Sequence, residues 1–329
     1  MTPPVPTTPL DLELRAAHPA DEPAVLRLMR ASLGWRDEDP NEEFFRWKHH
    51  DNAFGVSPAW VAVHQGSVVG YRTFLRWRFL DDAGREVRAV RAVDTATDPA
   101  YQGQGIFRRL TLRGVAELTL AGDGLVFNTP NDQSRPGYLT MGWSLARRIP
   151  VGVLPTGPRS ARRMLTSRVP AQLWSQATSA GLDAGEALAD GAVAAGLLGH
   201  APTTGFRTHR TPAYLAWRTS FAPLHYRLLL ASPHDPAEGG LVFRLRRRGS
   251  AMEAAVVEQL VPDRRTGIAL VRRMLTMTGA DYAIGLRSGP SAGLLPLPGQ
   301  GPLLTTRPLA ASPPSPRDWT LTLGDVELF

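Results

Sequence analysis

The feature that most constrains the fold is the run of residues 93–109. In it an apolar, β-branched stretch leads into a loop with two glycines and then an amphipathic segment. The turn at Asp98–Pro99 ends a predicted strand, Gly103 and Gly105 lie in the loop, and a helix is predicted to begin at Ile106. Glycines at alternate positions let the backbone approach a ligand, and N–H groups of the loop and of the helix N-terminus can point at one anion. The run therefore predicts a strand, an anion-binding loop and a helix.

The glycine pattern separates the candidate ligands of this loop. A P-loop requires a lysine after its second glycine, and a dinucleotide-binding loop requires a third glycine where Arg108 stands. The run Gln-Gly-Gln-Gly-Ile-Phe at residues 102–107 instead resembles the loop Gln/Arg-x-x-Gly-x-Gly/Ala, which binds the pyrophosphate of acyl-CoA in the GNAT N-acetyltransferase superfamily. The alternative is a tight strand-to-helix turn that needs its glycines for backbone conformation alone.

A second motif follows closely. Leu125–Phe127 predicts a short buried strand, Asn131 and Ser134 are helix-capping residue types, and Tyr138 and Gly142–Trp143 come next. In the same superfamily the next motif is a strand, Asn-x-x-Ser, a short helix that carries Tyr, and then Gly with an aromatic residue. The two motifs also occur in the order and at the separation that the superfamily shows, which strengthens the resemblance.

The N-terminal region agrees with this resemblance. Alternating residues at 12–15 predict a strand, residues 22–33 predict an amphipathic helix, and residues 60–72 predict a hairpin. Strand, helix, hairpin, long strand, glycine loop and helix is the element order of the superfamily. The resemblance covers residues 10–150 and implies an α+β fold, the GNAT fold, with a mixed, mostly antiparallel central sheet flanked by helices.

The resemblance also implies an acetyl-CoA site and no metal. In the superfamily the strand before the loop diverges from its neighbour, and its free N–H groups, here those of residues 95–97, pair with the pantetheine arm. The main chain of the loop binds the pyrophosphate, and Asn131 contacts the pantetheine region. The acetyl-CoA-binding residues that we expect are Thr95, Ala96, Thr97, Gln102, Gly103, Gln104, Gly105, Ile106, Phe107, Arg108, Asn131 and Ser134.

Acetyl transfer to an amine requires an acid for the leaving thiolate and a base for the amine. The resemblance gives the role of general acid to Tyr138. Two residues are candidates for the general base. One is Asp94, whose pKa we expect burial to raise, and the other is Glu86, which lies farther up the same strand. Further candidates are His49, His50 and, as in Eis-like relatives, the C-terminal carboxylate of Phe329.

Two segments of the C-terminal half are similar in sequence to segments of the N-terminal half. Phe44–Lys48 is matched by Tyr214–Arg218, 170 residues later, and Ala92–Thr95 is matched more loosely by Val256–Gln259, 164 residues later. Similar offsets in one order indicate an internal duplication, and coincidence in an Ala-, Arg- and Leu-rich chain is the alternative. The second copy lacks the Gly-x-Gly loop and the tyrosine motif, so the chain resembles tandem GNAT proteins with one degenerate copy, including the Eis-like branch.

These observations divide the chain into four parts. We expect a disordered Pro/Thr-rich tail at residues 1–9 and a catalytic GNAT domain with the acetyl-CoA site at 10–150. A helical linker at 151–205 and a second, degenerate GNAT-like domain at 206–329 follow. Residues 288–317 are rich in Pro, Gly and Ser and predict a long loop or an irregular edge.

All of the net charge of +7 arises after residue 150, because the first 150 residues hold 18 basic and 18 acidic side chains. Alternation along a strand places Arg244, Arg246 and Arg248 on one side. We interpret this cluster as a solvated hairpin edge rather than a nucleic-acid-binding surface. The absence of cysteine excludes disulfides, thiolate metal sites and an acyl-cysteine intermediate, and the histidines lack metal-ligand spacing.

The sequence shows no 18-residue apolar run and no signal-peptide pattern, so we expect a cytoplasmic protein without a membrane partner.

We predict an acetyl-CoA-dependent N-acetyltransferase that transfers the acetyl group directly to a primary amine. We expect that amine on a small molecule, because a second domain could enclose a pocket. One alternative acceptor is a protein or peptide amine. The other alternative is a non-catalytic, acyl-CoA-responsive binding protein whose Arg-rich second domain contacts nucleic acid or a partner. The sequence is also compatible with a homo-oligomer.

Overall fold

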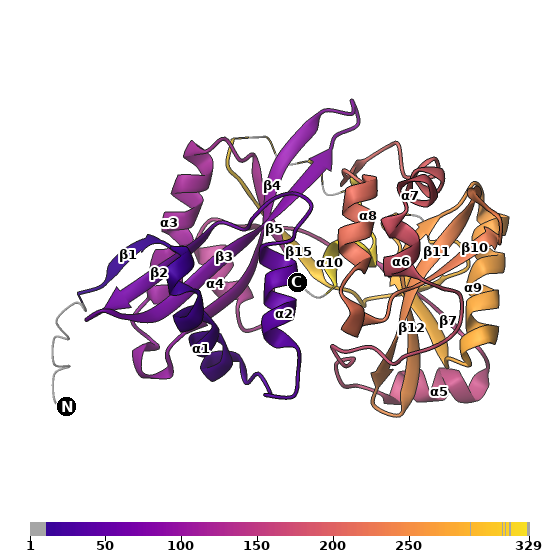
Figure 1. Cartoon of the computed structure of the whole chain (residues 1–329), viewed down its shortest axis with the longest axis horizontal. Helices are drawn as coiled ribbons and strands as arrows, with labels where there is room; N and C mark the ends of the chain where they lie inside the picture. The colour runs from indigo at the N-terminus through magenta and orange to yellow at the C-terminus, as the bar shows by residue number, and fades with distance from the viewer. Residues whose placement is uncertain (1–10, 290, 311, 313, 316, 328–329) are drawn as a thin grey trace.

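The computed structural model describes residues 11–289, 291–310, 312, 314–315 and 317–327. Within these residues the chain forms two mixed β-sheets with helices packed against them, one in the left half and one in the right half of Figure 1. The α+β class predicted from the sequence is confirmed. The tail predicted at residues 1–9 lies outside the described residues.

The first sheet has the strand order β1-β2-β3-β4-β5-β15-β6, and β9 joins the end of β3 to β16. Helices α1 and α2 pack on one face of this sheet, and α3 and α4 pack on the other face. The elements of this half are β1 (Glu13–Ala16), α1 (Glu22–Leu33), α2 (Asn41–His49), β2 (Ala59–His64), β3 (Ser67–Leu80), β4 (Glu86–Thr97), α3 (Ile106–Leu120), β5 (Leu125–Asn128), α4 (Arg135–Thr140) and β6 (Ser144–Arg148).

The second sheet has the strand order β14-β7-β13-β12-β11-β10-β8. Helix α9 packs on one face of it, against a buried cluster of its own. The remaining elements are β7 (Val151–Pro155), α5 (Pro158–Thr166), β8 (Leu182–Asp183), α6 (Ala184–Ala189), α7 (Gly191–Leu198), β9 (Phe206–Thr208), α8 (Pro212–Thr219), β10 (Arg227–Ser232), β11 (Asp235–Arg248), β12 (Ala251–Leu260), α9 (Arg264–Thr278), β13 (Tyr282–Leu286), β14 (Leu295–Leu297), β15 (Leu303–Pro308), β16 (Trp319–Thr320) and α10 (Leu323–Val326).

The two sheets repeat one arrangement. In the first, β2, β3 and β4 form an antiparallel meander, α3 crosses over, and β5 returns parallel to β4. In the second, β10, β11 and β12 form the meander, α9 crosses over, and β13 returns parallel to β12. The duplication predicted from the sequence offsets is therefore present in the structure.

The two copies exchange one strand each. β7 follows β6 along the chain, yet it pairs with β13 and β14 of the second sheet. β15 follows β14 along the chain, yet it lies between β5 and β6 of the first sheet. Each copy thus completes the sheet of the other, and main-chain hydrogen bonds tie the two halves together.

This exchange does not follow the domain boundaries that we predicted. The segment 151–205, expected as a helical linker, begins with β7 in the second sheet and also contains α5, β8, α6 and α7. The strands at 206–208 and 303–308, expected in the second domain, belong to the first sheet. The segment 288–317, expected as a loop or an irregular edge, holds β14 and β15. Pairing between distant segments leaves no trace in local composition, so the sequence could not reveal it.

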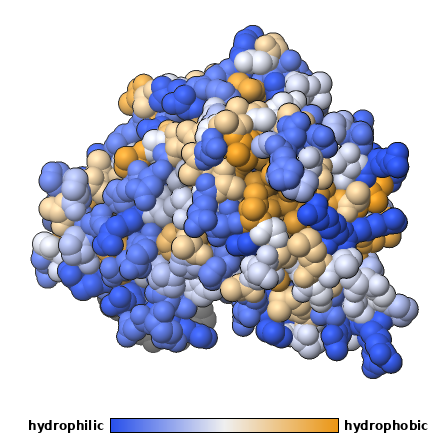
Figure 2. Space-filling view, turned by 45° about the vertical axis from the view of Figure 1, so that its right-hand side comes forward, coloured by the Kyte–Doolittle hydropathy of each residue, from blue (hydrophilic) through white to orange (hydrophobic). Residues whose placement is uncertain are grey.

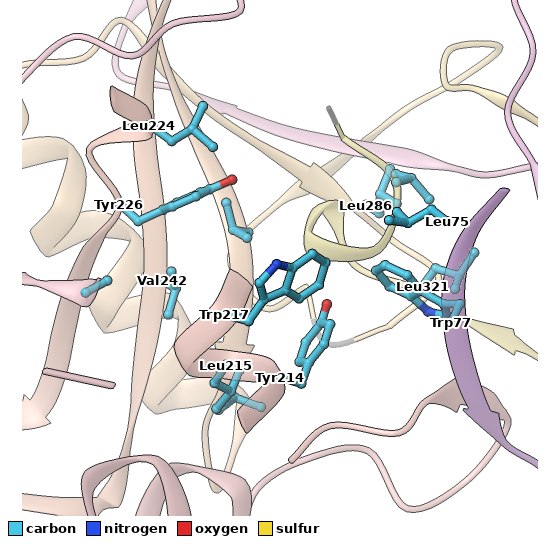
Figure 3. Packing of buried hydrophobic residues seen from close by; sticks show 14 of the residues in the cluster. Leu75, Trp77, Tyr214, Leu215, Trp217, Leu224, Tyr226, Val242, Leu286 and Leu321 are labelled. Atoms are coloured by element: carbon cyan, nitrogen blue, oxygen red, sulfur yellow. The ribbon is translucent and has the colours of Figure 1, made fainter. Parts of the chain in front are cut away.

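Helices α2 and α8 meet where the halves join. Trp47 of α2 stacks on Trp217 of α8 with 5.2 Å between ring centroids. Each indole N–H donates to the main-chain carbonyl of the other residue, at 2.8 Å from Trp47 and 2.9 Å from Trp217. Figure 3 shows Trp217 and Tyr214 in the middle of a buried cluster, with Trp77 of β3 on one side and Tyr226 on the other. One hydrophobic core therefore spans both halves.

The arginines of β11 do not form the solvated edge that we expected. Arg244 is fully buried, Arg246 and Arg248 are partly buried, and all three face the carboxylates of Glu253 and Glu327. The shared side predicted from alternation is correct, but its environment is a buried ion-pair cluster. Glu327 lies 83 residues after Arg244, so the sequence around Arg244 could not predict this ion pair.

No helix in the described part of the chain is long and apolar enough to cross a membrane. The face shown in Figure 2 is mostly hydrophilic, with apolar residues gathered in one area. Exposed apolar side chains such as Leu120 and Leu165 lie on different elements, α3 and α5, and single exposed residues of this kind are ordinary on a protein surface.

Close packing of α3 on the sheet depends on Gly114. A Cβ atom at this position would lie 2.8 Å from Cε2 of Phe74 and 3.0 Å from the Trp60 ring, and both rings are buried. We expect Gly114→Ala to destabilise the fold by up to about 2 kcal/mol, because a steric cost of about 1–3 kcal/mol is offset by a helix-propensity gain of only about 1 kcal/mol. Urea unfolding measures this change. The control is Gly191→Ala in α7, where no atom lies within 4 Å of the added carbon. Equal midpoints for the two variants would contradict this account.

Candidate active site

The candidate site begins where β4 leaves its neighbour. β4 pairs with β5 only over residues 89–91, although β4 continues to Thr97, so its last residues have no β5 partner. A bulge interrupts the β3–β4 register between the pairs Thr73–Val93 and Arg72–Thr95, and Asp94 in the bulge has a φ of +33°. The diverging edge of β4 and this strained bulge lie next to each other. Main-chain groups near the end of β4 are therefore open to a ligand.

A groove of about 330 Å³ lies at the end of β4. Residues from the end of β4, the glycine loop, the start of α3 and the end of α1 line it. The structure therefore brings together most of the residues that we predicted for acetyl-CoA. The lining residues are Ser32, Leu33, Thr95, Ala96, Thr97, Tyr101, Gln102, Gly103, Gly105, Ile106 and Phe107.

The loop glycines have the conformation that their residue type permits. Gly103 and Gly105 have φ angles of +76° and +71°, which side chains other than glycine rarely adopt. A Cβ atom at either position would meet no atom within 4 Å, so both face open space. Gly105 is also the N-cap of α3 and supplies no capping side chain. The first N–H groups of α3 are thus left for an anion in the groove.

Four of the predicted acetyl-CoA residues do not line this groove. Gln104 lies in the loop between the two glycines, and Arg108 donates to the carbonyl of Thr140 at 3.2 Å. Asn131 and Ser134 form a local turn, in which the side-chain Oδ1 of Asn131 accepts from the N–H and the hydroxyl of Ser134, both at 2.9 Å. These residues stay predictions for parts of the ligand outside the groove.

Tyr138 of α4 lies directly behind the groove. Its ring packs against Phe107, which lines the groove, with 5.5 Å between centroids, and against Trp143 at 5.2 Å. The residue is buried, and its hydroxyl makes no hydrogen bond to the described residues. Its proton is therefore not already shared with a protein acceptor in this part of the chain.

Asp94 is held by two cationic or polar neighbours from the end of α2. Its Oδ2 accepts from the Lys48 ammonium and lies 2.7 Å from Nε2 of His49, whose Nδ1 lies 2.9 Å from the Ser57 hydroxyl. Burial raises the pKa of the Asp94 carboxyl, but the Lys48 charge and the His49 contact outweigh it and hold this pKa below its usual range. The raised pKa that we expected from burial alone is therefore wrong, because the ion pair dominates.

The other candidate bases lie elsewhere or in ion pairs. Glu86 is at the opposite end of β4 from the groove and pairs with Arg78 and His209. His50 pairs with Glu22 at 3.2 Å. Phe329 lies outside the described residues. Glu86 is thus not brought to the groove.

Sequence reasoning missed several residues of the site. Ser32, Leu33 and Tyr101 line the groove, but nothing in their local pattern marks them. Lys48 did carry a signal, because it is the chain's single lysine and follows an aromatic helix segment. Arg72 carried one too, as the single charged residue in the run 67–75. Neither signal indicates a role for its residue without the contacts that the fold creates.

The corresponding cleft in the second sheet is partly filled by the chain itself, and a groove of about 340 Å³ remains at the end of β12 and the start of α9. β12 pairs with β13 only over residues 253–255, so β12 diverges in the same way as β4. Leu294 and residues 322–323 occupy the gap, where about 10 Å³ remains. At the start of α9, the Asp263 carboxylate accepts from the Thr266 N–H at 2.8 Å, so a protein carboxylate takes the place that an anion would need.

The sequence of residues 13–146 matches the family described as Acetyltransferase (GNAT) domain. The matched region contains the diverging strand, the glycine loop and Tyr138. A search among curated proteins finds no significant match to this chain.

Solved structures with the same fold cover 91% of this chain. A protein of Enterococcus faecalis V583, named a probable N-acyltransferase, has a TM-score of 0.65 at 13% identity, with 73% of its length covered. A GCN5-related N-acetyltransferase from Kribbella flavida has a TM-score of 0.61 at 16% identity, with 71% covered. Eis1 from Mycobacterium abscessus has a TM-score of 0.56 at 14% identity, with 74% covered. At these identities the likeness concerns the fold.

The family match and the shared fold agree with the groove and the tyrosine behind it. The acyltransferase class predicted from the sequence is confirmed. Residues 13–146 of this chain are therefore similar to the GNAT acetyltransferase domain family, and the chain shares its fold with N-acetyltransferases of known structure.

Proposed function

We propose that this protein transfers an acetyl group from acetyl-CoA directly to a primary amine of a small molecule. The observation that carries the proposal is the groove at the end of β4. There a diverging strand edge, a glycine loop with positive φ angles and an uncapped helix N-terminus meet. A long donor with an amide-containing arm and a pyrophosphate needs this combination of polar main-chain groups.

The residues present fit acetyl-CoA. Residues 95–97 would hold the pantetheine arm through their main chain, and residues 102–107 would bind the pyrophosphate in a loop that faces open space. Arg108, in the first turn of α3, adds positive charge near the phosphates, and Asn131 and Ser134 would contact the arm. When bound, acetyl-CoA supplies the thioester that the amine attacks.

Tyr138 would donate its hydroxyl proton to the leaving sulfur. Phe107 and Trp143 fix its ring, and its hydroxyl has no protein acceptor among the described residues. A positioned general acid typically contributes about 10²–10⁴-fold to the rate. Direct transfer agrees with the absence of cysteine from the chain.

Asp94 would bind the ammonium form of the acceptor rather than remove its proton. The lowered pKa keeps its carboxylate ionised and makes it a weak base. Its Oδ2 is shared by Lys48 and His49, whereas Oδ1 makes no hydrogen bond to the described residues. One-fifth of the side chain is exposed, so this second oxygen can meet a cation.

Contacts from the second half support a small acceptor. Arg91 of β4 donates to the carbonyl oxygens of Asp325 at 2.8 Å and Val326 at 3.1 Å, so the end of the chain lies against the strand that bears Asp94. A protein substrate would need this side to be open. The alternative function of binding nucleic acid through the second half has less support, because the β11 arginines pair with buried carboxylates.

We expect the purified protein to bind acetyl-CoA in isothermal titration and the Gly103→Asp/Gly105→Asp variant to lose this binding. Each aspartate would strain a positive-φ position and place a negative charge where phosphates lie. Gly122→Asp, at a positive-φ position after α3, controls for strain alone. Equal heats for wild type and the double variant would contradict the assignment of the loop.

We expect Tyr138→Phe to lower kcat for thiol release by about 10²-fold or more while the acetyl-CoA titration is unchanged, because only the acidic proton is removed. A thiol-reactive dye with a panel of primary amines measures the rate. Absence of turnover by the wild type with every amine, together with acetyl-CoA binding, would favour the non-catalytic alternative. Unchanged kcat in the variant would remove Tyr138 from the mechanism.

We expect Asp94→Asn to destabilise the protein by about 3 kcal/mol at pH 7, because the buried Lys48 ammonium loses its counter-ion. The pKa of Asp94 is lower in the folded than in the unfolded state. The ion pair therefore stabilises the fold fully above the unfolded value of about 3.9, and its contribution is lost as the pH falls through the folded pKa.

Urea unfolding from pH 7 to pH 3 tests this expectation. The gap between wild type and Asp94→Asn should hold down to about pH 5 and narrow below about pH 4. Asp37→Asn, which breaks an exposed pair with Arg30, should change stability by less than about 1 kcal/mol at any pH. A gap that widens on acidification would contradict the ion-pair account.

A further inference from the structure

Arg72 of β3 is a buried cation without a counter-ion among the described residues. Its side chain is fully enclosed, and no carboxylate of the described part lies within salt-bridge distance. Nη1 donates to the carbonyl of Val93 at 3.3 Å, whereas Nε and Nη2 have no hydrogen-bond partner. Burying a charged group in this way is costly unless something compensates it, so the position calls for a physical explanation.

Three aromatic rings surround the guanidinium. Its Cζ lies 4.6 Å from the ring centroid of Phe74, 5.5 Å from that of Tyr138 and 5.6 Å from that of Phe107. Aromatic faces carry partial negative charge and attract a cation, most strongly when water is excluded. The cage offsets part of the desolvation of Arg72, but it leaves the positive charge unneutralised.

The cage adjoins the proposed reaction centre on two sides. Phe107 lines the groove, and Tyr138 is the proposed general acid. Val93, the acceptor of the Arg72 hydrogen bond, immediately precedes Asp94 in the bulge of β4. An uncompensated cation thus lies 5.5 Å from the ring centroid of the residue that would protonate the leaving group.

We propose that Arg72 is a positioning residue for acyl transfer, whose cation stabilises the negative charge on Tyr138 after the tyrosine has protonated the leaving sulfur. The proposal rests on the proposed function. In that step the amine nitrogen forms a bond to the acyl carbon, and the carbon–sulfur bond breaks. The sulfur takes the hydroxyl proton of Tyr138, which becomes a phenolate and regains a proton from solvent. The acceptor, held by Asp94 as an ammonium, loses one proton to water before it attacks, and its nitrogen loses a second proton to water as the amide forms.

The other charged groups around Tyr138 are engaged with different partners. Arg91 of β4 donates to the carbonyl groups of residues 325–326, and Arg108 of α3 donates to Thr140. Arg307 of β15 donates to the carbonyl of Met141 and lies over the Trp143 ring. Among the described residues, Arg72 is the cation that lies over the Tyr138 ring, whereas Arg91 interacts with Tyr138 electrostatically but interacts more strongly with the Asp325 carboxylate.

The experiment compares Arg72→Met, Arg72→Lys and the control Arg78→Met, which removes a half-exposed arginine from the far end of the same strand. Rates are measured with acetyl-CoA and, as probe amines, spermidine, tyramine and lysine methyl ester. For Arg72→Met we expect kcat to fall roughly 10- to 30-fold, the effect of a desolvated cation on an aromatic partner, with little change in KM for acetyl-CoA. Arg72→Lys should keep most of the activity, because it keeps the charge.

Two further readouts separate this role from a structural one. With S-acetyl-4-nitrothiophenol, whose thiolate leaves without a proton, Arg72→Met should match the wild type. In a Tyr138→Phe background, Arg72→Met should cause no further loss of kcat, because the group it acts through is gone. Isothermal titration with acetyl-CoA confirms that each variant is folded, and Arg72→Gln replaces Arg72→Met if the latter does not fold.

Equal loss with both donors, or a full additional loss in the Tyr138→Phe background, would overturn the proposal and assign Arg72 to structure alone. An unchanged kcat in Arg72→Met would overturn it as well while the proposed function stands. A wild type that binds acetyl-CoA but acetylates no amine and releases no thiol would overturn the proposed function, and this inference with it.

Discussion

The stacked pair of Trp47 and Trp217 is the contact on which both halves of the structure depend. Each indole donates to the main-chain carbonyl of the other, so loss of either ring removes one of these hydrogen bonds and the stack as well. The pair fixes α2 against α8. The next residues of α2, Lys48 and His49, hold Asp94 in the bulge of β4. Arg218, which follows Trp217 in α8, donates to the carbonyl of Gly324 at 2.9 Å. The contact between the copies therefore also orients groups on both sides of the candidate site.

The two copies use the same cleft in opposite ways. In the first, a glycine caps α3 and the edge of β4 is open, so polar groups are left for a ligand. In the second, Asp263 caps α9, and Leu294 with residues 322–323 fills the gap beside β12. The C-terminal segment therefore fills the inner part of the second cleft, although a groove of about 340 Å³ remains where α9 begins. That segment in turn reaches Arg91 on β4 of the first copy. The C-terminal segment, held in the second copy, thus also contacts the strand that carries the candidate site in the first copy.

Local spacing determined what the sequence could predict. The glycine loop, the helix after it and the position of Tyr138 depend on residues within one short segment, and the structure has them where the pattern indicates. The exchange of β7 and β15 was not predictable, because both strands pair with segments far away along the chain. Alternation correctly placed Arg244 and Arg246 on one side of a strand but could not reveal Glu327 opposite them. Likewise, burial of Asp94 was foreseeable, whereas the ammonium that reverses its effect comes from α2.

The buried arginines of this molecule differ in whether a carboxylate neutralises their charge. This difference distinguishes the arginines that stabilise the fold from the one that would act in the reaction. The buried arginines at the junction of the halves face carboxylates: Arg210 meets Glu258 and Asp325, and Arg244 meets Glu327. Each such pair recovers part of its desolvation through its partner, so the pairs fix geometry and leave little net field. Arg72 is as deeply buried but has aromatic faces and the Val93 carbonyl around it instead of a carboxylate, and its charge is therefore not neutralised. An uncancelled cation destabilises a resting protein and stabilises a transient anion next to it. Such a group is an advantage only where negative charge develops, and Tyr138 is where the proposed transfer would create it.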